Sequence, residues 1–202
     1  AVIVAAARTP VGRARGALAP VPAEDLGALV VREVVKRSKV DPKEVDEVIF
    51  SNLMNTNVNN MGRMVALKAG LPIDVPGIAL DRQCGASLNS FAYAAMIIQS
   101  GFADVIVAGG VESDSRRNYV MDKPVMGYQI MPPQWSQISV VPKEYGKDSM
   151  VETADNLAEK YGLSREECDQ FAVESHAKAA AAQEAGHFDS QLIPVEVQER
   201  KS

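Results

Sequence analysis

Two short apolar runs on either side of a helical segment constrain the fold more than any other feature of this chain. Residues 75–80 (VPGIAL) and 104–108 (DVIVA) have the length and composition of buried strands. Residues 86–99 (ASLNSFAYAAMIIQ) lie between them and predict a helix that ends at Ser100 and Gly101. A strand, a helix and a second strand in succession predict an α/β unit with a partly parallel sheet.

Three further segments predict strands. Residues 2–7 (VIVAAA) and 48–50 (VIF) are continuously apolar, as strands are when both faces of a parallel sheet are covered. Residues 191–197 predict an edge strand, because Pro194 has no amide hydrogen to donate to a neighbouring strand.

Amphipathic periodicity and capping residues predict the other helices, over residues 24–39, 42–44, 62–69 and 164–185. The last of these begins with a capping box, in which Ser164 and Glu167 satisfy each other's backbone amides. Residues 114–149 contain four prolines, the only Trp and little periodicity, which predicts an irregular region.

Cys84 stands in the turn before the helix of residues 86–99. Apolar side chains occupy most of the circumference of that helix, which predicts that it is buried on most sides and that Cys84 lies at a buried helix N-terminus. The unpaired amides and the dipole at a helix N-terminus favour an anion such as a thiolate. Periodicity alone equally allows a small buried apolar residue. Polar neighbours favour a nucleophile on a sharp turn, and these are Asp81, Arg82, Gln83, Gly85 and Ser87.

Overall composition excludes several classes of protein. The formal net charge of −5 and the pI of about 5.1 argue against a nucleic-acid partner. No run approaches the ~18 apolar residues of a membrane span, so we expect no membrane partner. Two cysteines are too few for a disulfide scaffold. Cys168, His176 and His187 lie in or beside the helix of residues 164–185, where surface positions are expected, and no metal site is predicted.

The cysteine usage and the N-terminal sequence bear on the compartment. Reduced cysteines suit the cytosol or an organelle matrix. The opening AVIVAAARTP lacks the charged and apolar regions of a targeting signal. We expect a cytoplasmic protein, with the mitochondrial matrix or a peroxisome as the alternative after removal of a leader.

Four segments, in order, resemble the thiolase (acetyl-CoA acetyltransferase) family. They read AVIVAAARTPVGR, NNMGRMVALKAGLP, DRQCGASLNSFAYAAMIIQSGFADVIVAGGVES and SMVETADNLAEKYGLSREECDQFA. The resemblance implies an α/β fold with a βαβαβαββ half, whose mixed five-stranded sheet has helices on both faces. It also implies the first part of an inserted loop domain. The expected core half spans residues 1–114 and the partial loop domain residues 115–202.

The resemblance also implies an activity and its residues. Cys84 matches the cysteine that becomes acylated, and its amide is a possible oxyanion donor. Ser149 and Met150 match a segment that lines the acyl and pantetheine site, although His is common at position 149. Ser113 and Asp114 likewise stand where Met and Ser are common, which leaves the acyl-chain preference open. Acyl-CoA and coenzyme A are the implied substrates, with no tightly bound cofactor.

The family's catalytic histidine, asparagine and second cysteine belong to its second half and have no match here. We therefore expect an N-terminal half that lacks its C-terminal partner half and is inactive alone. The family implies a homodimer or homotetramer, with the loop of residues 52–63 resembling a contact segment. Two alternatives remain: a non-catalytic scaffold or lipid-carrier subunit, and a β-ketoacyl synthase relative, whose cysteine context differs from DRQCGAS.

Overall fold

The computed structural model describes residues 1–123, 132, 134–136, 141, 142, 144–146 and 148–197. The chain divides into two compact units, one of Ala1–Asn118 with Ser190–Ser202 and the other of Tyr119–Asp189. The predicted domain boundary after residue 114 stays a prediction. In the part of the chain that is described, no helix combines the length and hydropathy that crossing a membrane requires.

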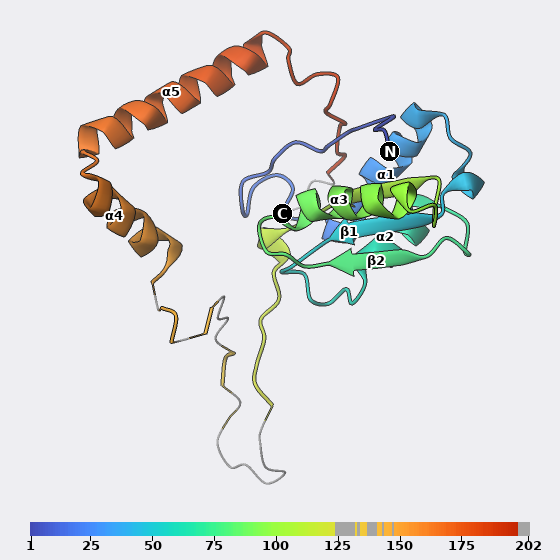
Figure 1. The fold of residues 1–202 in the computed structure, drawn as a ribbon, viewed down its shortest axis with the longest axis horizontal. Helices are drawn as coiled ribbons and strands as arrows, with labels where there is room; N and C mark the ends of the chain where they lie inside the picture. Colours follow the sequence, from blue (N-terminus) through green and yellow to red (C-terminus); the bar gives the residue numbers. More distant parts are fainter. Residues whose placement is uncertain (124–131, 133, 137–140, 143, 147, 198–202) are drawn as a thin grey trace. The chain divides into compact units, whose positions relative to one another are not determined.

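A parallel sheet organises the first unit. Its strands are β1 (Glu47–Ser51), β2 (Gly77–Leu80) and β3 (Ile106–Gly110), in the order β2-β1-β3 (Figure 1). The central strand β1 pairs in parallel with both neighbours. Each parallel crossover carries a helix, as parallel strands require: α2 (Met61–Ala69) joins β1 to β2, and α3 (Ala86–Gln99) joins β2 to β3. The predicted parallel α/β unit is confirmed.

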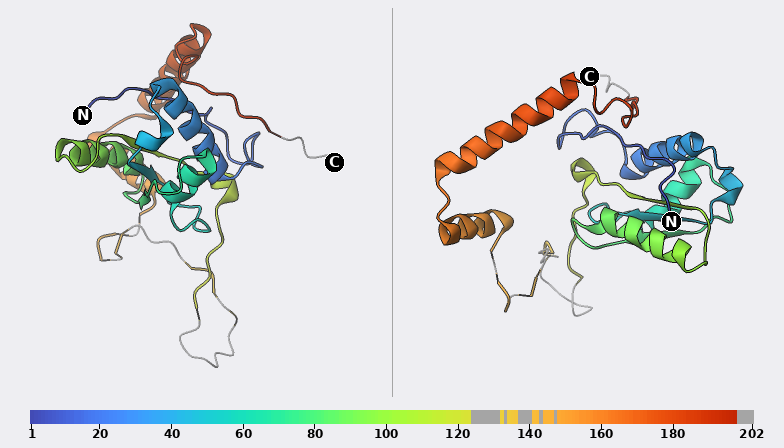
Figure 2. Two further views of the ribbon diagram at one scale, coloured as in Figure 1. Left: turned by 90° about the vertical axis from the view of Figure 1, so that its right-hand side faces the viewer. Right: turned by 45° about the horizontal axis from the view of Figure 1, so that its top comes forward.

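The helices form layers on the two faces of this sheet. Val48 and Phe50 of β1 pack in one buried cluster with Val31 of α1 (Ala23–Ser38) and Val65 of α2. Successive side chains of a strand point to opposite faces. Ser51 accordingly faces away from that cluster and meets α3. The ribbon views show α3 over one face of the sheet and α1 and α2 over the other (Figures 1 and 2).

Gly62 explains how closely α2 lies on the sheet. A Cβ at this position would lie 2.3 Å from the carbonyl oxygen of Ile78 and 2.6 Å from that of Val48. Only glycine permits this approach of helix to strand backbones. Asn60 caps the helix by accepting a hydrogen bond from the Arg63 amide, and Gly70 ends it with φ +85°.

The described part of the first unit also has two 3-10 helices. The short helix predicted from residue 42 is the 3-10 helix η1 (Pro42–Glu44), with Asp41 as its N-cap and a capping box to Glu44. The other, η2 (Asp114–Arg116), follows β3.

Two predicted strands are wrong, and a third is displaced. Residues 2–7 are not a strand: Val2 is 84% exposed and Ile3 is 81% exposed. Residues 191–197 are not a strand either, and one isolated parallel bridge joins Arg8 to Leu192. An apolar run becomes a strand only when a neighbouring backbone pairs with it. The described residues form three strands, whereas the resemblance implies five. The strand predicted at residues 104–108 is β3, which begins and ends two residues later.

The described residues of the second unit form two helices, α4 (Met150–Tyr161) and α5 (Arg165–Glu184). Both begin with a capping box, at Ser149 with Glu152 and at Ser164 with Glu167. The capping box of Ser164 and Glu167 was predicted from the sequence and is confirmed. Gly162, with φ +65°, ends α4.

Candidate active site

Cys84 lies in a tight turn between β2 and α3. The Asp81 carboxylate accepts a hydrogen bond of 2.8 Å from the Gln83 amide. The Gly85 amide donates to the Arg82 carbonyl at 3.1 Å, and the Ala86 amide donates to the Gln83 carbonyl at 3.0 Å. Gln83 has φ +49°, a conformation that residues other than glycine adopt at a cost. A strained residue thus directly precedes the thiol.

The thiol of Cys84 is free and exposed. Gly85, the N-cap of α3, has no side chain to satisfy the first-turn amides. In the described part of the chain, the amides of Ser87 and Leu88 have no hydrogen-bond acceptor. Unpaired amides at a helix N-terminus favour negative charge, so this end of α3 suits a thiolate or an oxyanion.

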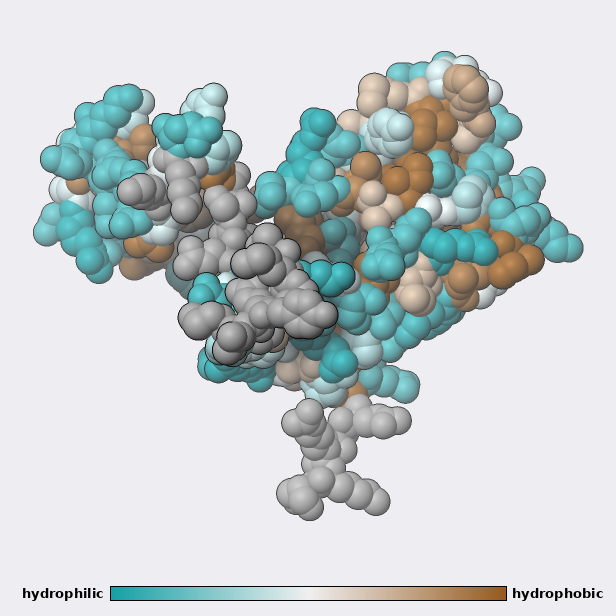
Figure 3. All heavy atoms as spheres, turned by 90° about the horizontal axis from the view of Figure 1, so that it is seen from below, coloured by the Kyte–Doolittle hydropathy of each residue, from teal (hydrophilic) through white to brown (hydrophobic). Residues whose placement is uncertain are grey.

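The prediction that α3 is buried on most sides is wrong for the described residues. Only Ala86, Ser90 and Ala94 of this helix are buried, and Leu88 is 75% exposed. The sheet covers one side of the helix, and no other described element covers the opposite side. Hydrophobic residues, in brown, accordingly reach the surface of the first unit (Figure 3). Cys84 therefore lies at an exposed helix N-terminus instead of a buried one.

A hydrogen-bonded loop borders the same edge of the sheet. The Glu112 carboxylate accepts from the amides of Leu53 at 2.9 Å and Met54 at 3.1 Å. The buried Asn55 side chain donates to the Ser113 carbonyl at 3.1 Å and accepts from the Ser113 amide at 3.0 Å. Sequence reasoning predicted only an irregular loop here and missed the roles of Asn55 and Glu112. The available signal was an asparagine-rich loop together with an acidic residue two positions after a strand that ends in glycine.

The other predicted site residues lie in the second unit. Ser149 is the N-cap of α4 and accepts from the Glu152 amide, while Met150 is the first helical residue and is exposed. Cys168 and His176 are exposed on α5, and His187 is exposed just beyond it. Ser149 and Met150 belong to the second unit and Cys84 to the first, so their role in the acyl and pantetheine site stays a prediction.

Two carboxyl groups of the first unit have shifted pKa values, and neither belongs to the Cys84 turn. Burial raises the pKa of Glu47, which stands at the opposite end of β1 from the sheet edge beside Cys84. A hydrogen bond from Arg37 lowers the pKa of Glu33 on α1. Among the described residues, no group of three or more His, Cys, Asp or Glu side chains could hold a metal ion.

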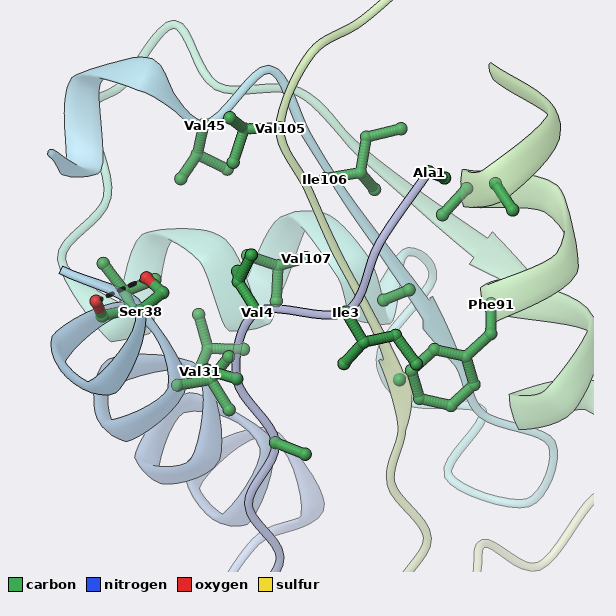
Figure 4. A pocket seen from close by; sticks show the side chains of 18 of the residues that line it. Ala1, Ile3, Val4, Val31, Ser38, Val45, Phe91, Val105, Ile106 and Val107 are labelled. Atoms are coloured by element: carbon green, nitrogen blue, oxygen red, sulfur yellow. Dashed lines mark hydrogen bonds between the residues drawn. The ribbon is translucent and has the colours of Figure 1, made fainter. Parts of the chain in front are cut away.

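An apolar cavity of about 820 Å³ lies beside β3, between α1 and α3. Figure 4 shows the N-terminal segment that carries Ile3 and Val4 crossing this cavity, with Phe91 of α3 on one side and Val31 of α1 on the other. Its lining contains neither Cys84 nor any titratable side chain. Ser87 and Leu88 do line the cavity, so it reaches the start of α3 beside the turn.

The similarity to known proteins covers the whole chain. The family "Thiolase, N-terminal domain" matches residues 1–202. The chain is 42% identical to the beta-ketoadipyl-CoA thiolase of Acinetobacter baylyi over 100% of its length, and 39% identical to the acetyl-CoA acetyltransferase of Cupriavidus necator over 99%. The crystal structure of the Bacillus anthracis acetyl-CoA acetyltransferase matches with a TM-score of 0.88, 38% identity and 100% of this chain covered. The chain spans about half the length of these relatives, 53%, 52% and 52% respectively.

Proposed function

Because the chain belongs to the thiolase family and matches its N-terminal domain, we propose that Cys84 is the nucleophile of an acyl-CoA C-acyltransferase. The enzyme would make or cleave 3-oxoacyl-CoA. The observation that carries this proposal is the exposed Cys84 thiol, on a strained turn, beside the unpaired first-turn amides of α3. Two relatives named as acetyl-CoA acetyltransferases support an acyl-CoA substrate.

The first half-reaction is transfer of an acyl group to sulfur. The Cys84 thiolate attacks the thioester carbonyl of an acyl-CoA, and the carbonyl oxygen becomes an oxyanion. The bond from carbon to the coenzyme A sulfur then breaks, coenzyme A leaves as a thiolate that takes up a proton, and an acyl-Cys84 thioester remains. Backbone amides near Cys84 are candidate oxyanion donors, each typically worth about 3 kcal/mol.

The second half-reaction forms the carbon–carbon bond. A base removes an α-proton from a second acyl-CoA, and the carbanion attacks acyl-Cys84 to yield 3-oxoacyl-CoA and the free thiolate. Thiolysis is the reverse. By resemblance to the family, the base comes from the second half, which this chain does not match.

Further parts of the proposal rest on the resemblance alone. Ser149 and Met150 contact the acyl and pantetheine groups, no cofactor is tightly bound, and the enzyme assembles as a homodimer or homotetramer. The proposed cytoplasmic location rests instead on the reduced cysteines and the N-terminal sequence.

Intact-mass spectrometry after incubation with excess acetyl-CoA tests the proposal. We expect one acetyl group on Cys84, and it should persist because the chain lacks a matched base for the second half-reaction. Cys84→Ala should abolish the adduct, whereas Cys168→Ala, which removes the other exposed thiol, should retain it. An acetyl group that survives in Cys84→Ala would contradict the assignment. A native chain without any adduct would favour a non-catalytic scaffold.

A further inference from the structure

Ser51 lies at the centre of the sheet edge from which the Cys84 turn departs. It is the last residue of β1, and its register partners are Leu80 at the end of β2 and Gly110 at the end of β3. The turn that carries Cys84 begins directly after Leu80. Strand pairing at Ser51 therefore fixes the point where the chain enters the turn.

The side chain of Ser51 reaches the other end of the same turn. Its Oγ lies 2.7 Å from the Oγ of Ser87, which is in the first helical turn of α3, three residues after Cys84. Ser51 is 4% exposed, so its hydroxyl depends on this partner. Among the described residues, this is the one side-chain hydrogen bond between α3 and the sheet.

Gly110 provides the space for the two hydroxyl groups. A Cβ at position 110 would lie 2.1 Å from the Oγ of Ser51 and 2.1 Å from the Oγ of Ser87. Any side chain there would displace the pair. The ends of β1 and β3 and the start of α3 thus meet closely at these three residues.

We propose that Ser51 is a positioning residue for Cys84, because it holds both ends of the nucleophile turn. Pairing with β2 holds the strand end, and the hydroxyl contact with Ser87 holds the helix start. Apolar packing is non-directional and would leave α3 more freedom to rotate on the sheet. A directed hydrogen bond keeps the first-turn amides in one place relative to the sulfur, where they stabilise negative charge. This inference rests on the proposed function of Cys84.

The test is the rate of Cys84 alkylation by iodoacetamide as a function of pH in the 202-residue protein, read by peptide mass spectrometry. The exposed Cys168 thiol is the internal reference. Ser51→Ala and Ser87→Ala should each lower the rate at neutral pH about fivefold, the factor that one hydrogen bond of ordinary net strength supports. Both should leave the alkylation rate of Cys168 unchanged.

Three variants sharpen this result. Ser87→Thr keeps the hydroxyl and should retain the native rate. Gly110→Ala keeps both hydroxyls but displaces them, and it should reproduce the loss. Ser100→Ala is the matched control, because it removes a hydroxyl at the opposite end of α3, where the Ser100 Oγ donates to the Ile97 carbonyl, and it should change nothing.

Circular dichroism verifies the fold of each variant. If Ser51→Ala does not fold, the comparison of the Cys84 alkylation rates of Ser87→Ala and Ser87→Thr tests the inference. Equal Cys84 rates in the native protein, Ser87→Ala and Gly110→Ala would overturn the inference. A native chain that takes up no acetyl group from acetyl-CoA would instead contradict the proposed function, since iodoacetamide requires no acyl-CoA site.

Discussion

Gln83 shows how a single residue shapes the neighbourhood of the nucleophile. Its φ of +49° places a side chain in the left-handed region, which costs on the order of 1–3 kcal/mol. The Asp81 carboxylate and the carbonyl groups of Arg82 and Gln83 accept the hydrogen bonds that hold this conformation. The turn therefore stores strain next to Cys84 and fixes the direction in which the chain enters α3.

A β-branched residue at position 83 should destabilise the first unit. Gln83→Val should lower the free energy of unfolding by about 2 kcal/mol, because a β-branched side chain tolerates positive φ poorly. Gln83→Gly should change it by less than about 1 kcal/mol, because relief of strain offsets the added freedom of the unfolded chain. Urea denaturation measures both. Arg82→Val is the matched control. An equal decrease in the free energy of unfolding of this variant would contradict the role assigned to the positive φ of Gln83.

At the scale of elements, α4 and α5 depend on their N-terminal capping boxes. Each serine Oγ accepts from the glutamate amide at 3.2 Å, and each glutamate carboxylate accepts from the serine amide, at 2.6 Å in α4 and 2.8 Å in α5. The hydrogen bond from the Ser149 amide lowers the pKa of Glu152 below its ordinary 4.5, and the Ser164 amide does the same for Glu167. Both helices therefore begin with a pH-sensitive contact.

Acid should fray the start of α4 and α5. A carboxyl group whose pKa is lowered by folding stabilises the folded state above its unfolded pKa, and this contribution is lost as pH falls through the folded pKa. The loss should begin near pH 4.5 and continue below it. Amide NMR signals of Ser149 and Ser164 report the change. Glu152→Gln keeps an oxygen acceptor that does not titrate, so the pH dependence should disappear at Ser149 and persist at Ser164.

For the whole molecule, the outer face of α3 is the feature that most affects behaviour in solution. Leu88, Phe91 and Met96 are exposed large apolar residues on one helix. Exposed apolar patches of this kind promote association. The cavity beside β3 adds further uncovered apolar surface to the same unit.

The chain should self-associate through this face. Met96→Lys should reduce concentration-dependent association while changing the free energy of unfolding by less than about 0.5 kcal/mol, as is usual for exposed positions. Sedimentation velocity over a series of concentrations measures the association. Val173→Lys, at an exposed position on α5 of the second unit, is the control and should leave it unchanged. Equal effects of the two substitutions would rule out α3 as the associating face.

Sequence by itself determined the local elements of this protein and the identity of its candidate nucleophile. The helix predicted over residues 86–99 has those same bounds as α3, and the box predicted at Ser164 is present. Helical hydrogen bonds and caps join residues only a few positions apart, so their signals lie within a short window. The position of Cys84 just before α3 can be predicted for the same reason, because it depends on a few neighbouring residues.

Only the tertiary structure decided which runs became strands and what surrounds the Cys84 turn. Residues 2–7 are as apolar as β1, yet they lie outside the sheet, because strand pairing depends on a distant neighbour. Ser51 and Ser87 are 36 positions apart, and Asn55 and Ser113 are 58 apart. No local pattern encodes contacts over such separations, since they form only when the sheet brings its strand ends to one edge.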